Sequence, residues 1–207
     1  MSKASVSVRF AMEVLATLSR HIDWGSLDPK YLQKNVVEDP VRAGRMMTWV
    51  LRGCPKVDSI KMEEEFDPQV FFGTGTDMLV YDSDRSPKTP ATLDFRKVRF
   101  IPIPHDCRFD REHLDGRRTT TSGGVFLGAK AFISCWCNSH LLPDEWKQRG
   151  LSGNPRKICF DGDSLNDTGG VSYVLCMWFD GREWVFGTMI VGADRGSDTL
   201  VSAFQEA

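Results

Sequence analysis

The alternation of apolar and polar positions is clearest in the C-terminal third of the chain. The apolar runs KICF, SYVLCMWF and EWVFGTMIVG have the length of strands and are rich in β-branched and aromatic residues. Asp180-Gly181 stands between the last two runs, and Asp-Gly is the strongest short signal for a hairpin. The pattern therefore predicts an antiparallel meander, followed by a polar tail from residue 193 in which we expect one further turn of helix.

The first 53 residues instead carry apolar positions at helical spacing. Residues from Ala11 to Leu18 form one apolar stripe of this kind. The pairs Asp28-Pro29 and Asp39-Pro40 each indicate a helix start, because Asp caps a helix and proline fits its first position. This part of the chain therefore predicts short helices.

The middle of the chain mixes both patterns. Residues 56–95 are polar and rich in turn residues, with one short strand expected over Met78 to Tyr81. The run VRFIPI at 98–103 alternates at period two and predicts a strand near a sheet edge. Residues 127–137 predict an apolar helix, and a second helix is expected to begin at Pro143.

These elements predict an α+β protein. Short helices occupy the N-terminal part, and two further helices pack on a C-terminal antiparallel β-sheet, the meander described above. We expect a helical segment at 1–55, a polar linker with a short strand at 56–95, and an α+β domain at 96–207.

Composition narrows the classes of function. The chain has 207 residues, of which 41% are hydrophobic, and its six Trp and 13 Phe require burial. Its 26 Lys and Arg nearly balance 28 Asp and Glu, so the net charge of −2 gives no overall field that attracts nucleic acid or an anionic membrane.

Two features predict the compartment. The longest apolar runs, such as 171–179, are far shorter than the roughly 20 residues that cross a bilayer, so we expect no contact with a membrane. Arg9 and Glu13 interrupt the N-terminal apolar stretch, which argues against a signal peptide. We therefore predict a cytoplasmic protein with reduced cysteines. Cys135, Cys159 and Cys176 lie in apolar contexts, where a cysteine acts as a small hydrophobic residue.

The acidic stretch KICFDGDSLND is the sharpest candidate for chemistry. An apolar run followed by Asp161 and Asp163 resembles the start of haloacid-dehalogenase phosphatases, but only 44 residues follow Asp163 and they predict antiparallel strands rather than βα units. An EF-hand loop counted from Asp161 fails at its fifth, sixth and twelfth positions. Because FDG recurs at 179–181, we predict that Asp161-Gly162 opens a strand reversal and that Asp163 and Asp167 face water.

Other catalytic or metal patterns are weak. Cys135 and Cys137 lie two residues apart on one predicted helix and point about 200° from one another, which separates two ligands of a zinc site. The chain contains no Gly-x-Ser-x-Gly elbow and no Walker loop. We therefore predict no catalytic residue and no cofactor. The zinc candidates weighed by spacing are His105, Cys107, His113, Cys135, Cys137 and His140.

Basic and aromatic residues leave nucleic-acid binding open. Arg96, Lys97 and Arg99 flank a strand, and Trp178 and Trp184 fall on the predicted sheet, a combination that can seat a single strand by charge and stacking. A basic loop over 108–118 adds to this set, but acids interleave it, so single-stranded nucleic-acid binding is not favoured.

The segments LGAKAFISCWCNSHLLPDEWK, ICFDG and VLCMWFDGREWVFG together carry a family resemblance. They resemble a family of uncharacterised hypothetical proteins from ultra-small candidate-phylum bacteria, most densely over residues 127–187. Cys159 stands where an aromatic is usual, and the aromatic-rich ending of that family is missing. The resemblance implies a cytoplasmic bacterial protein and supports the sheet, and it assigns no activity. The matching positions are Ala131 to Asn138, His140 to Pro143, Trp146, Lys147, Phe160 to Gly162, Tyr173 to Leu175 and Trp184.

We therefore predict a non-enzymatic intracellular binding or interaction module. Its partner is left open, and another protein is one candidate. Trp178, Arg182 and Trp184 mark the sheet surface considered first for that role. The alternatives are a metal-dependent hydrolase that acts through Asp161, Asp163 and Asp167, and single-stranded nucleic-acid binding.

Overall fold

The computed structural model describes residues 40–51, 56–62, 66–73, 80–81, 90–104, 110, 112, 114–116, 122–192 and 199–207. The chain divides into two compact units, residues 1–44 and 45–207. The helices expected before residue 40 lie outside the described residues, as does most of the charged loop over 105–121.

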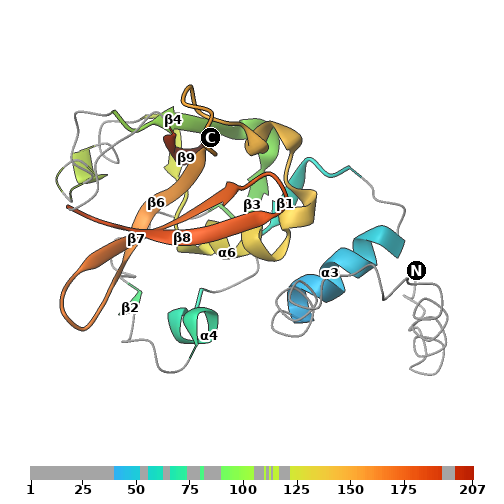
Figure 1. Ribbon diagram of the computed structural model, residues 1–207, viewed down its shortest axis with the longest axis horizontal. Coiled ribbons are helices and arrows are strands. Elements are labelled where there is room, and N and C mark those ends of the chain that lie inside the picture. Colours follow the sequence, from blue (N-terminus) through green and yellow to red (C-terminus); the bar gives the residue numbers. More distant parts are fainter. Residues whose placement is uncertain are drawn as a thin grey trace. The chain divides into compact units, whose positions relative to one another are not determined.

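A mixed sheet forms the centre of the second unit (Figure 1). Its neighbouring strands are antiparallel except β6 and β9, which run parallel. Two short strands add to the path, β2 (Val80–Tyr81) on β6 and β5 (Gly124–Phe126) on β9. The α+β class and the β6–β7–β8 meander are therefore confirmed. The strand order is β4 (Val98–Pro102), β9 (Leu200–Glu206), β6 (Lys157–Asn166), β7 (Ser172–Phe179) and β8 (Trp184–Ile190).

The C-terminal tail is a strand inside the sheet, and the expected helical turn was wrong. β9 pairs with β4 on one side and with β5 and β6 on the other. Two of its polar residues, Ser202 and Gln205, are buried and hydrogen-bonded. The Gln205 side-chain amide donates to the carbonyl of Thr92 at 3.2 Å and accepts from the backbone amide of Asp94 at 3.1 Å. In the sequence, polar residues that find hydrogen-bond partners inside the protein cannot be distinguished from those of a solvent-exposed tail. The strand was missed for this reason.

Strand β6 continues through Asp161-Gly162, so the strand reversal predicted there was wrong. The chain turns only after β6 ends at Asn166, where the amide of Gly170 donates to the carbonyl of Asp167 at 3.1 Å and Gly170 has a φ of 80°. The register between β6 and β7 shifts between Phe160 and Leu165, which is a β-bulge or a similar irregularity. The second Asp-Gly pair, Asp180-Gly181, does form the predicted hairpin between β7 and β8.

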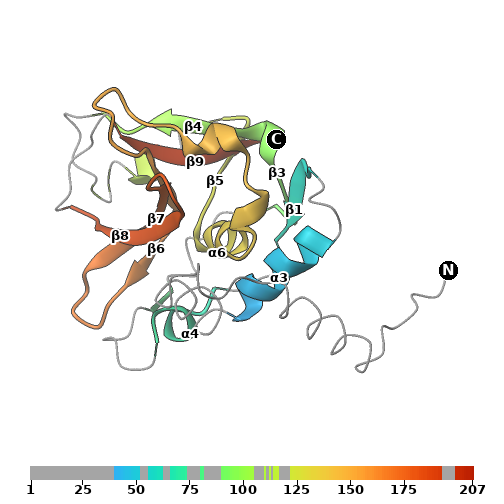
Figure 2. The ribbon, with the colours of Figure 1, turned by 45° about the vertical axis from the view of Figure 1, so that its right-hand side comes forward.

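The helix α6 (Ala129–Cys137) lies against the concave side of the sheet, which curves around it in Figure 2. Its Phe132 is fully buried and meets the ring of Phe160 edge-on at 5.5 Å between centroids. The helix expected from Pro143 is only a short 3-10 turn, η6 (Asp144–Lys147), which follows another, η5 (Ser139–Leu141). The helix predicted after Asp39-Pro40 is α3 (Pro40–Leu51).

The segment expected as a polar linker contributes to the core. A two-stranded ribbon pairs β1 (Ser59–Lys61) with β3 (Thr92–Asp94), which continues into the 3-10 turn η4 (Phe95–Lys97). The short helix α4 (Pro68–Phe72) is capped by Asp67. Within the described residues, no helix is long and apolar enough to cross a membrane. The buried apolar residues of this region are Ile60, Met62, Phe66, Leu93 and Phe95.

The start of α6 and the middle of β6 approach so closely that only glycine fits between them. The amide of Gly162 donates to the carbonyl of Leu127 at 3.0 Å. A Cβ atom at position 162 would collide with the carbonyl oxygen of Phe126 and lie 2.9 Å from the amide of Gly128. Because these are backbone atoms, they cannot move aside as a side chain would.

We expect Gly162→Ala to lower the free energy of unfolding by about 3 kcal/mol, the upper part of the range for overpacking. Gly44→Ala is the control, because a Cβ there meets no atom within 4 Å and alanine favours a helix. Urea unfolding followed by circular dichroism measures both variants. Equal stability of the two would show that β6 and α6 do not meet as closely as described.

Candidate functional site

The carboxylate of Asp163 is buried and caps helix α6. Its side chain is 2% exposed, and its Oδ1 accepts a hydrogen bond from the amide of Ala129 at 2.7 Å. The residue before the helix is Gly128, which has no side chain to cap it, so a carboxylate from β6 takes that role. A side chain at position 128 would collide with this carboxylate.

The other two acids of the stretch have separate partners. Asp161 is also 2% exposed, and its Oδ2 accepts from the hydroxyl of Ser202 at 2.6 Å. Asp167, at the turn, accepts from the amide of Val171 and the hydroxyl of Tyr173, both at 2.8 Å. The expectation that Asp163 faces water was therefore wrong. Across the described ranges, no group of three or more His, Cys, Asp or Glu is placed to hold a metal ion.

The cysteines that the structure describes are buried free thiols. Burial raises the pKa of Cys135 on α6, which keeps its thiol protonated and makes it a poor nucleophile. His105, Cys107 and His113, the other zinc candidates, lie outside the described residues. Cys159 and Cys176 lie side by side on neighbouring strands of the sheet.

The structure does not bring Trp178 and Trp184 onto one surface. Trp184 pairs with Phe179 across the β7–β8 hairpin, whereas Trp178 pairs with Val185, and neighbouring positions of a strand face opposite sides. Trp184 is 5% exposed and packs edge-on against Phe179, with ring centroids 5.8 Å apart. Arg182 is exposed at the hairpin tip.

A groove on another part of the unit combines an aromatic floor with a charged rim, and we name it the aromatic groove. Its volume is about 800 Å³. Trp146 from η6 forms the floor and meets the rings of Phe95 and Phe100 edge-on at 5.5 and 5.2 Å. The groove is lined by Lys56, Val57, Asp58, Phe95, Arg96, Val98, Arg99, Phe100, His140, Leu141, Leu142, Pro143, Asp144, Glu145, Trp146, Lys147, Gln148 and Arg156.

Several charges of the rim already have partners. Arg96 pairs with Asp58 at 3.5 Å and with Asp94 at 2.9 Å, and its hydrogen bonds hold the pKa of Asp94 below the usual value. Lys147 donates to Asp144 at 2.6 Å, which lowers the pKa of that carboxyl.

Arg99 is held in the same way. Its guanidinium pairs with Glu206 at 3.0 Å and also donates to the backbone carbonyl of Arg96 at 2.9 Å. The three cations Arg96, Arg99 and Lys147 therefore have much of their bonding capacity satisfied within the protein.

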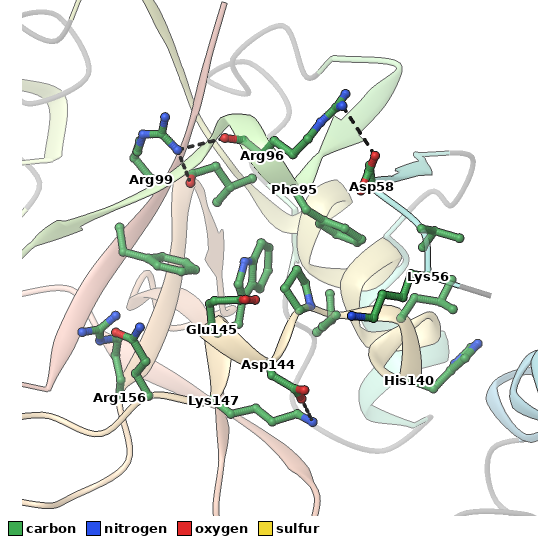
Figure 3. A pocket seen from close by; sticks show the side chains of 18 residues that line it. Lys56, Asp58, Phe95, Arg96, Arg99, His140, Asp144, Glu145, Lys147 and Arg156 are labelled. Atoms are coloured by element: carbon green, nitrogen blue, oxygen red, sulfur yellow. Dashed lines mark hydrogen bonds and ion pairs between the residues drawn. The ribbon is translucent and has the colours of Figure 1, made fainter. Parts of the chain in front are cut away.

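Two cations of the rim differ from these. Within the described part of the chain, neither Lys56 nor Arg156 has a carboxylate within ion-pair distance. Figure 3 shows them on opposite sides of the groove. Five Lys or Arg face three Asp or Glu around the groove, so it is locally positive in a chain whose net charge is −2.

The sequence pointed to only part of this groove. Arg96 and Arg99 belonged to the basic patch considered for nucleic acid, and Trp146 and Lys147 to the resembling family segment. Lys56 and Arg156 are a hundred residues apart, and no local sequence pattern indicates that both line the same groove. Only the tertiary packing brings their segments together.

The comparisons with known proteins gave no match among family models, curated proteins or solved structures. The function is therefore inferred from the chemistry of the site.

We expect Asp163→Ala to destabilise the protein by about 2–3 kcal/mol, because the amide of Ala129 loses its acceptor in a buried place. Asp163→Asn is the control, since its amide oxygen still accepts that hydrogen bond, and it should lose clearly less. Chemical unfolding gives both values. Equal losses would mean that the negative charge, rather than the acceptor, stabilises the helix start.

Tyr173→Phe should raise the pKa of Asp167. The amide of Val171 and the hydroxyl of Tyr173 hold that pKa below the reference value of 3.8, and the variant removes only the second donor. Because the pKa is lower in the folded state, Asp167 stabilises the fold above about pH 4, and this stabilisation is lost as the pH falls through the folded pKa. Tyr173→Phe should therefore lose less stability than the unaltered protein over that pH range.

Carboxyl ¹³C NMR titration measures that pKa directly. Ser172→Ala is the matched control, because the Ser172 hydroxyl donates to Asn166 at 2.7 Å on the same turn. An unchanged Asp167 pKa in Tyr173→Phe, or an equal shift in Ser172→Ala, contradicts the assignment.

Proposed function

We propose that this protein is a non-enzymatic binding module whose aromatic groove holds an extended acidic segment of a partner protein. The observation that carries the proposal is the pair Lys56 and Arg156, which lie on opposite sides of an apolar floor. In the described residues neither has a carboxylate within ion-pair distance, although Lys56 lies near enough to Asp144 to help lower the pKa of that carboxyl. Cations so separated do not converge on a single carboxylate or phosphate. An extended chain with several negative charges reaches both.

The position of strand β4 supports an extended ligand. β4 is the terminal strand of the described sheet, with β9 as its neighbour. Val98, Arg99 and Phe100 are consecutive and so point to alternate sides, yet all three line the groove. The groove therefore runs along β4, a terminal strand to which an extended peptide can add, although the carbonyl of Val98 already accepts from the Arg99 guanidinium at 3.3 Å and Pro102 has no N–H to donate.

The floor favours a peptide over single-stranded nucleic acid. Nucleic-acid grooves need aromatic faces open for bases to stack on. Trp146 is 3% exposed and Phe95 is 7% exposed, because each covers the other. Apolar side chains of a peptide need only the shallow apolar surface that remains, together with the half-buried Phe100.

The hydrolase alternative has no comparable support. Asp161, Asp163 and Asp167 are engaged with Ser202, with the start of α6 and with the β6–β7 turn respectively. None of them lines the aromatic groove.

A phage library of random peptides, each about seven residues long as an ordinary strand is, tests the proposal. We expect the protein to enrich sequences in which Asp or Glu alternate with apolar residues. The charge-reversal variant Lys56→Glu/Arg156→Glu should bind such a peptide at least roughly tenfold more weakly in fluorescence anisotropy, because like charges then face each other. Binding by the unaltered protein should weaken with added salt.

The matched control is Lys157→Glu/Arg182→Glu, which changes the net charge equally outside the groove. It should keep the affinity of the unaltered protein. Enrichment of no acidic sequence, or equal binding by the groove variant, overturns the proposal. Tighter binding of oligothymidylate than of any peptide would assign the groove to nucleic acid instead.

A further inference from the structure

Three sulfur atoms meet in the sheet on the side opposite α6. Cys159 on β6 and Cys176 on β7 are direct cross-strand partners, and the Cys176 thiol donates to the sulfur of Cys159 at 3.1 Å. The Cys159 thiol in turn donates to the thioether of Met189 on β8 at 3.6 Å. We call Cys159, Cys176 and Met189 the three-sulfur cluster.

The surroundings of the three-sulfur cluster are largely apolar, but the direct partner of Cys159 on β9 is the buried Ser202, which hydrogen-bonds the buried Asp161. Cys159 is 0% and Cys176 is 1% exposed. Met189 is 7% exposed and belongs to β8, the terminal strand at the end of the described sheet opposite β4. Met189 is therefore the member nearest to the solvent. The apolar residues packed with the cluster are Ile103, Leu114, Val174 and Leu200, with Val191 partly buried beside them.

We propose that the three-sulfur cluster binds one soft monovalent metal ion of the Cu(I) class. Thiolate and thioether sulfur together select such an ion, whereas zinc sites take Cys, His or carboxylate ligands and do not use a thioether. An ion at roughly 2.3 Å from each sulfur bridges sulfurs up to about 4.6 Å apart. The distances of 3.1 and 3.6 Å fall within that reach.

The third sulfur distinguishes this site from a simple cysteine pair. Cross-strand neighbours have Cα atoms about 4.5–5.5 Å apart, which also suits a disulfide. A disulfide bond does not involve a thioether sulfur, whereas a metal ion with few ligands can bind one. The ion reaches the cluster from the β8 edge, on the side of Met189.

The charges of the binding step balance in a defined way. Each thiol releases its proton to water as its metal–sulfur bond forms, and Met189 donates a lone pair without losing a proton. Two thiolates and one Cu(I) leave a single negative charge. The hydrogen bond with Cys176 and burial raise the pKa of Cys159, and the charge of Asp161 raises it further while that of Lys157 lowers it, so the metal ion itself must drive the loss of the proton.

Anaerobic titration of the full chain with Cu(I), in competition with the chelator bathocuproine disulfonate, tests the proposal. All variants carry Cys54→Ser and Cys107→Ser, so that these two thiols do not compete. We expect one equivalent of Cu(I) to resist the chelator, and Cys159→Ser/Cys176→Ser to lose it. Cys135→Ser, which removes a buried thiol outside the cluster, should keep it.

Met189→Leu replaces the thioether by an apolar side chain of similar size. The variant should therefore fold, and a loss of Cu(I) binding would report the missing sulfur rather than unfolding. It should bind Cu(I) roughly tenfold more weakly or worse, since even outer partners of a metal have effects of that size. Added Cu(I) should also raise the melting temperature of the parent more than that of Met189→Leu. The proposal is overturned if no equivalent of Cu(I) resists the chelator, or if Met189→Leu binds Cu(I) as tightly as the parent. It is also overturned if the protein binds no metal and Cys159 and Cys176 instead form a disulfide when glutathione disulfide is added.

Discussion

The hydrogen bond between the Asp163 carboxylate and the first turn of α6 is the constraint on which the core depends. It fixes the start of the helix against the middle of β6, and it does so at a buried position where water cannot replace it. Gly128 and Gly162 let the two backbones approach closely enough for that bond. With the helix anchored in this way, Phe132 enters the aromatic core beside Phe160.

The two sides of the sheet then have different chemistry. On the α6 side, large aromatic rings pack edge-on in a continuous cluster. On the other side a small group of sulfur and aliphatic side chains fills the space. Polarisable sulfur suits the second place because it fills irregular gaps without a polar partner. That packing role is also what brings Cys159, Cys176 and Met189 together.

The aromatic groove lies where the sheet ends at β4. Trp146 is locked by Phe95 and Phe100, so the floor is rigid, and most cations of the rim are neutralised by acids of the same unit. Lys56 and Arg156 stand apart from these pairs. In the proposed complex, a floor of packed rings limits the entropy that binding costs, and the two cations favour a negatively charged ligand.

Local pattern in the sequence determined the α+β class, the hairpin at Asp180-Gly181 and the strands β4, β7 and β8, because alternation and turn residues act between near neighbours. It did not determine that β6 passes through Asp161 and Asp163, nor that the polar tail is the strand β9. Those outcomes depend on partners 34 and 41 residues away, Ala129 for Asp163 and Ser202 for Asp161. In the sequence, a carboxylate that will be buried cannot be distinguished from one at an exposed turn. The tertiary structure decides between them by bringing a hydrogen-bond donor to the buried one.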